Sequence, residues 1–182
     1  IPRETVFVVD QSESFRASKA NALGDAIGVY IESVEALPVS ERVGFASCSA
    51  SNDDLDLRYD REAFVDAMKG GDQTGQADLG KGMGAGALIL DHGKPDRFVD
   101  RNLIIISGDA GSHAGDPVEM AKSIAAQGIK IHTIHFGSAS QPNRLSEIAK
   151  RGGGRHYEVR DAAGLSSALR ELALSVATTT TQ

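Results

Sequence analysis

The sequence predicts an α/β fold with a doubly wound, mainly parallel, Rossmann-like sheet flanked by helices. Short apolar runs rich in β-branched residues alternate along the chain with longer segments in which apolar residues recur every three or four positions. This alternation indicates strands joined by crossover helices, which connect parallel strands. The run Leu103–Ile106 is apolar at every position, as expected for a central strand that helices cover on both faces.

Strands are expected in the apolar runs, at Thr5–Val9, Val43–Ser47, Leu103–Ile106, Ile129–Phe136 and His156–Val159. The acidic stretch Asn52–Arg58 alternates weakly between apolar and charged residues. It is therefore expected to form a short edge strand or a hairpin arm with solvated carboxylates.

Helices are expected between the strands. The first runs from about Arg16 to Leu37, where Leu23, Ile27 and Val34 lie on one apolar stripe, and Pro38 ends it. Later helices are expected at Arg61–Met68, Ala77–Leu90, Pro117–Ala126, Asn143–Lys150 and Leu165–Ala177.

Several local signals refine these expectations. Asp116 followed by Pro117 is a typical helix start, and Gly128 lies just past the end of the same helix. Glycines in the segment Gly80–Gly86 lower helix propensity, so close packing against a neighbouring element is expected there. The triplet Gly152–Gly154 lacks the context of a dinucleotide-binding loop and is expected to form a flexible turn.

The length and composition fit one globular domain. The chain has 182 residues, 41% of them hydrophobic, and shows no internal repeat or interdomain linker. We expect the domain to span residues 1–177 and residues 178–182 to form a threonine-rich tail or linker. Because Ile1 opens almost directly into a strand, the chain is expected to be part of a longer protein or assembly.

Charge and hydropathy exclude several function classes. The net charge of −6 does not provide the basic surface that nucleic-acid binding requires. No apolar run approaches the roughly 18 residues needed to cross a bilayer, so this segment is not expected to insert into a membrane. The single cysteine, Cys48, cannot form an intrachain disulfide and is expected to pack as a small buried residue.

Candidate ligand-binding residues follow the predicted strands, because open parallel sheets bind ligands at the carboxyl ends of their strands. Asp10, Ser12 and Ser14 come directly after the first strand, at a spacing that lets their oxygens converge. Asp109 follows the central strand and is expected beside Asp10, where two carboxylates repel unless a cation lies between them. Thr74 is a candidate further donor. Oxygen donors of this kind suit Mg²⁺, Mn²⁺ or Ca²⁺.

This pattern resembles the von Willebrand factor A domain and its metal-ion-dependent adhesion site, which combines Asp-x-Ser-x-Ser, a later threonine and an aspartate after a core strand. Asp10, Ser12, Ser14 and Asp109 match that motif. The resemblance implies a metal site completed by Thr74, with Mg²⁺ the first choice of cation. It also implies a protein partner whose Asp or Glu fills the open coordination position. An extracellular, cell-surface or periplasmic location is slightly favoured.

The sequence departs from the family pattern at three places. Glu13 stands where the family usually has glycine, and Ser107–Ala110 replaces the more usual Thr-Asp-Gly ending. The threonine position has two alignments, one that uses Thr74 and one that places Ala77 there. The identity of that donor therefore stays open.

Three functions are weighed. The first is cation-dependent protein binding, and the second is a metal-independent assembly scaffold of the same fold. The third is a metal-assisted hydrolase with Ser12 or Ser14 as nucleophile and His113 as base, which we do not favour.

Other histidines and arginines are expected to have structural or surface roles. His132 and His135 are three residues apart on a predicted strand, so they are expected on opposite faces and cannot share a metal. Arg151 and Arg155 are expected on a solvated rim.

Overall fold

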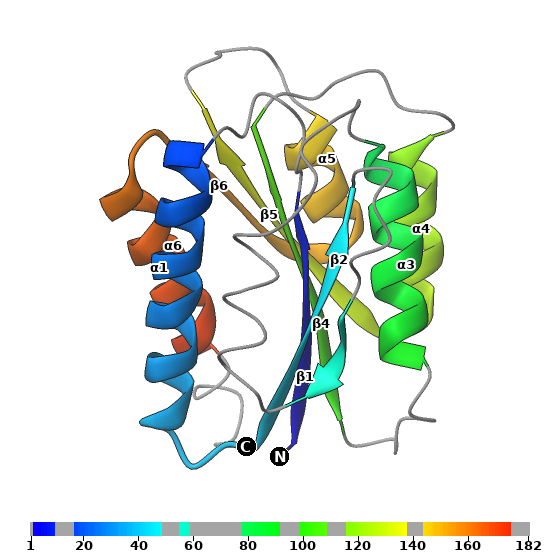
Figure 1. Ribbon diagram of the computed structural model, residues 1–182. Helices are drawn as coiled ribbons and strands as arrows, with labels where there is room; N and C mark the ends of the chain where they lie inside the picture. The colour runs from blue at the N-terminus through cyan, green and yellow to red at the C-terminus, as the bar shows by residue number, and fades with distance from the viewer. Residues whose placement is uncertain are drawn as a thin grey trace.

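The computed structural model describes residues 2–9, 17–48, 55–58, 78–91, 99–108, 116–137 and 144–175 (Figure 1). The elements in these ranges are β1 (Arg3–Val9), α1 (Ala17–Glu35), β2 (Glu41–Ser47), β3 (Leu55–Arg58), α3 (Leu79–Asp91), β4 (Asp100–Ser107), α4 (Pro117–Ala126), β5 (Ile129–Phe136), α5 (Arg144–Arg151), β6 (Gly153–Val159) and α6 (Ala162–Leu174).

The strands form one sheet in the order β3-β2-β1-β4-β5-β6. β1 pairs in parallel with both β2 and β4, the outer strands β5 and β6 continue in parallel, and β3 is antiparallel to β2. The chain therefore winds outward from β1 in one direction through β2, and returns to β4 to wind in the other. This confirms the predicted doubly wound, mainly parallel α/β fold, whose direction reverses between β1 and β4.

Helices cover both faces of the sheet (Figure 1). On one face, α1 and α6 pack against alternate strand residues such as Phe7, Val9 and Ile104. On the other face, α3, α4 and α5 pack against Val6, Val8 and their neighbours. All residues of β1 are buried, because a central strand covered by helices on both faces has no side exposed to solvent.

The predicted elements agree with the structure in most places. The strand β3 confirms the short edge strand expected within Asn52–Arg58, whereas the helix expected at Arg61–Met68 lies outside the described residues. The helix α6 begins three residues before the predicted Leu165, because Asp161 caps it by accepting a hydrogen bond from the backbone amide of Gly164 at 2.7 Å. In α4, Asp116 caps the start as expected.

The glycines of α3 bring this helix close to the centre of the sheet. A Cβ added at Gly82 would lie 2.5 Å from Sγ of Cys48 and 2.8 Å from Cγ1 of Val8, and one at Gly86 would lie 2.8 Å from Cδ2 of Leu103. The close packing expected for this segment is confirmed, and Cys48, only 1% exposed, is part of it. Gly84, by contrast, faces open space, since a Cβ added there would meet no atom within 4 Å.

The expectation of a turn at Gly152–Gly154 is wrong for Gly153 and Gly154, and only Gly152 lies in a turn, between α5 and β6. Gly153 and Gly154 belong to β6, and a Cβ on Gly154 would lie 1.9 Å from the backbone oxygen of Ile131. A Cβ on Gly152 would lie 2.5 Å from Cβ of the same isoleucine. These glycines let β6 start directly against β5, and Gly153 also adopts a φ of +71° that favours glycine.

We predict that Gly82→Ala destabilises the domain by roughly 1–3 kcal/mol, because the added methyl group clashes with two buried side chains. Gly84→Ala is the matched control on the same helix and should stabilise it by up to about 1 kcal/mol through helix propensity. Urea unfolding of both variants measures the difference. Equal effects at the two positions would contradict the packing argument.

Candidate functional site

The carboxyl edge of the sheet at β1 and β4 is the place where an open α/β sheet binds ligands. Val9 lies opposite both Ser47 of β2 and Ile106 of β4. The last residues of β1 and β4 therefore lie side by side at this edge, and Gly108 continues directly from β4. The predicted site residues Asp10, Ser12, Ser14, Thr74 and Asp109 lie outside the described residues, as do Glu13, Ala77 and His113.

A chain of backbone hydrogen bonds ties the start of α3 to the same edge. The amide of Cys48 donates to the carbonyl of Val9 at 2.9 Å, and the amide of Asp78 donates to the carbonyl of Cys48 at 2.7 Å. Asp78 in turn caps α3, since its Oδ1 accepts from the amide of Lys81 at 3.2 Å. Asp78 is thereby attached to the edge at which β1 ends.

The described residues Val9, Asp78 and Gly108 thus lie at one edge of the sheet. In the sequence, these three residues border the segments that carry the predicted donors. The donors are hydroxyl and carboxylate oxygens, a set that fits a hard divalent cation. Within the ranges that the structure describes, no group of three or more His, Cys, Asp or Glu side chains could hold a metal ion.

A separate polar cluster lies farther along this edge, between β5 and β6. Glu158 accepts from Nδ1 of His135 at 2.6 Å and contacts Nε2 of His156 at 2.8 Å. The Thr133 hydroxyl donates to the carbonyl of Leu145 at 2.9 Å, so it accepts from Nδ1 of His156 at 2.8 Å. The cluster joins α5 to the two outer strands.

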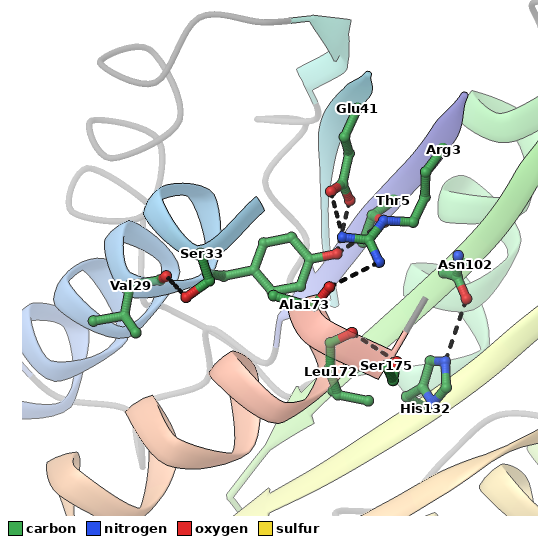
Figure 2. Close-up of polar contacts among 11 residues, drawn as sticks. Arg3, Thr5, Val29, Ser33, Glu41, Asn102, His132, Leu172, Ala173 and Ser175 are labelled. Atoms are coloured by element: carbon green, nitrogen blue, oxygen red, sulfur yellow. Dashed lines mark hydrogen bonds and ion pairs between the residues drawn. The ribbon is translucent and has the colours of Figure 1, made fainter. Parts of the chain in front are cut away.

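The opposite, amino-terminal edge contains a buried ionic cluster that the sequence analysis did not identify (Figure 2). Arg3 donates to Glu41 at 2.7 Å and to the carbonyl of Ala173 at 3.2 Å, and the Arg3 and Glu41 side chains are 1% and 3% exposed. Tyr30 donates to Glu41 at 2.7 Å, and burial, followed by the charge of Glu41, raises the pKa of its hydroxyl well above the usual range. The sequence signal that could have revealed this cluster is the presence of charged residues at the start of two apolar strands.

His132 lies on the same face as this cluster and is nearly buried, with 9% of its surface exposed. Its Nδ1 accepts from the amide of Arg155 at 3.1 Å, so its proton is on Nε2, 3.3 Å from Oδ1 of Asn102 (Figure 2). Burial, assisted by the positive charge of Lys130, lowers its pKa to about 4. His135 contacts Glu158 instead, so the two histidines have separate partners on opposite faces, as predicted.

The exposed arginines also agree with the sequence analysis. Arg151 pairs with Glu147 at 3.0 Å on α5, and Arg155 pairs with Glu171 at 3.2 Å. Both pairs are largely solvent-exposed, and such pairs contribute little to stability. None of the helices in the described ranges combines the length and apolar content that crossing a membrane requires.

Comparison with known proteins identifies the fold. The model of the von Willebrand factor type A domain family matches residues 4–171, whereas no curated protein sequence matches the chain. The solved structure of the conserved hypothetical protein BatB from Bacteroides thetaiotaomicron is 17% identical, with a TM-score of 0.76, and the match covers 96% of this chain and 99% of that one.

Two further structures share the fold over part of a longer chain. Proximal thread matrix protein 1 from the mussel byssus, with a zinc-occupied MIDAS motif, is 16% identical with a TM-score of 0.71, over 94% of this chain and 45% of that one. The pilus adhesin SpaC from Lactobacillus rhamnosus GG is 13% identical with a TM-score of 0.72, over 96% of this chain and 30% of that one.

We predict that His132 makes the domain less stable as the pH falls from 6.5 towards 4. In that window the unfolded chain binds a proton on His132 that the native state does not, so unfolding becomes easier by up to about 3 kcal/mol. His132→Asn keeps an acceptor near the position of Nδ1 and removes the titration. Urea unfolding at several pH values should show a shallower loss of stability in the variant, and an unchanged slope would contradict this assignment.

Proposed function

Because the chain belongs to the von Willebrand factor type A domain family, we propose that it is a protein-binding module that acts through a divalent cation at the carboxyl edge of the sheet. Domains of this family are generally binding modules and not enzymes. The observation that carries the proposal is that Val9 and Asp78, which border donor-bearing segments in the sequence, lie at this edge beside the end of β4, through the pairing of Val9 with Ile106 and the hydrogen bonds from Cys48 and Asp78.

Each donor has a role in this proposal. Asp10 and Asp109 supply the negative charge that attracts the cation, and Ser12, Ser14 and Thr74 supply neutral oxygens. Keeping some ligands neutral leaves the cation with residual positive charge. The bound cation, Mg²⁺ first and Mn²⁺ or Ca²⁺ as alternatives, offers an open position to the Asp or Glu carboxylate of a protein partner.

The negative net charge of the chain is compatible with an acidic partner, because the cation attracts the partner's carboxylate. Two similar structures support the proposal: one has a zinc-occupied MIDAS motif and another is a pilus adhesin. We also propose that the domain spans residues 1–177 and that residues 178–182 form a tail or linker, which agrees with a family match over residues 4–171.

We predict that Asp10→Ala abolishes Mg²⁺ and Mn²⁺ binding in isothermal titration calorimetry, because it removes a carboxylate that faces the cation. The residue follows the end of a strand, so the free energy of unfolding without metal should change by less than about 1 kcal/mol. Asp91→Ala, at the opposite end of α3 and exposed, is the control and should bind metal normally. Normal metal binding by Asp10→Ala would overturn the site, and binding of the partner with EDTA present would favour the scaffold function.

A second pair of variants tests the threonine position. If Thr74 is the donor, Thr74→Ala weakens metal binding, whereas Ala77→Thr leaves it unchanged. If the donor position is at Ala77, the threonine introduced there adds a ligand and strengthens binding, and Thr74→Ala has no effect. Titration of both variants with Mn²⁺ distinguishes the two alignments, and no response in either variant would exclude both.

A further inference from the structure

A pocket of about 250 Å³ lies at the amino-terminal edge of the sheet, between the end of α1 and the start of β2. Its apolar wall is formed by Ile31, Val34, Val39 and Val43, and its acidic side chains are Glu35 and Glu41. Seven residues of β1 separate this edge from the carboxyl edge, a distance of roughly 23 Å at about 3.3 Å per residue. The pocket is therefore independent of the proposed cation site.

The charge of the pocket is negative. Among the described residues that line it, two are carboxylates and none is basic. Glu41 forms the inner side, where Arg3 and Tyr30 both donate to it at 2.7 Å. Glu35 is exposed at the outer side, at the last position of α1. A cation that enters the pocket therefore meets the exposed Glu35 first. The charge of Glu41 is already neutralised by Arg3.

The end of α1 adds to this negative charge. The carbonyl groups at the C-terminus of a helix carry a partial negative charge, so basic residues are favoured there. The helix α5 follows this rule with Lys150 and Arg151 in its last turn, but α1 has no basic residue in its last turn and ends in Glu35. Among the described residues of the α1 last turn and the pocket lining, no basic side chain offsets this negative charge.

We propose that this pocket binds the basic side chain, lysine or arginine, of a protein partner. The aliphatic stem would lie along Ile31, Val34 and Val39, and the cationic head would reach Glu35 and the end of α1, since such side chains bury their stems while the head stays near water. Pockets that enclose whole small molecules measure roughly 300–1,000 Å³. A volume of about 250 Å³ suits one side chain.

The proposal is tested by NMR titration of the full 182-residue chain. The probe is a capped tripeptide with lysine between two glycines, and the control peptide carries norleucine, which has a similar stem and no charge. We expect the lysine peptide to shift the backbone amides of Val34, Glu35 and Glu41 and to bind at least about fivefold more tightly than the norleucine peptide, about 1 kcal/mol. Equal binding of the two peptides would overturn the proposal.

Two substitutions of Glu35 and one control substitution test which carboxylate binds the lysine head. Glu35→Gln should weaken binding of the lysine peptide by at least about fivefold. Asp25 is an exposed acid on the same helix outside the pocket, so Asp25→Asn should bind the peptide as the unmodified chain does. Glu35→Lys should abolish binding and raise the urea midpoint, because it places a cation at the helix end. Unchanged binding of the lysine peptide by Glu35→Gln would contradict the proposal. Binding of n-butylammonium without binding of the capped peptide would also contradict it.

Discussion

The parallel pairing of β1 with both β2 and β4 is the constraint on which the other features depend. It places the end of β1 at the point where the winding of the chain reverses, with Val9 opposite Ile106. The carbonyl of Val9 then accepts from Cys48, whose own carbonyl accepts from Asp78. Buried backbone groups need partners, and in satisfying each other these groups attach the start of α3 to the same edge. Residues far apart in sequence are therefore held together by backbone hydrogen bonds.

The close approach of α3 depends on the same pairing. Gly82 packs directly against Val8 and Cys48. The pairing of β1 with β2 fixes the positions of both of these residues. A helix with several glycines has low intrinsic propensity, so burial of its apolar face against β1 must stabilise it. The glycines thus lower the helix propensity of α3 but allow a short distance between this helix and the sheet. Because of this short distance, Asp78 at the beginning of the helix lies close to the end of β1.

The strands and most helices could be predicted because their signals are local: apolar runs, periodicity and caps such as Asp116. The roles of Gly152 and Gly154 could not, because they depend on contact with Ile131, which lies on another strand. The ionic cluster around Arg3 and Glu41 was missed for the same reason, since a charged residue in a strand reveals no partner by itself. The site residues themselves, such as Asp10 and Asp109, were predicted from a motif and remain predictions.

The two edges of the sheet differ in how their charges are arranged. Around Arg3 the charges are paired and buried, and a buried pair is strongly destabilised when one partner is lost. The cluster therefore anchors the end of α6, through the carbonyl of Ala173, to β1 and β2. Beside it, the exposed Glu35 is arranged against the helix dipole. Locally unfavourable choices of this kind are concentrated at functional sites in natural proteins. Because a buried pair and an unfavourable exposed acid lie next to one pocket, the same edge can be rigid in its interior and still attract a cation from outside.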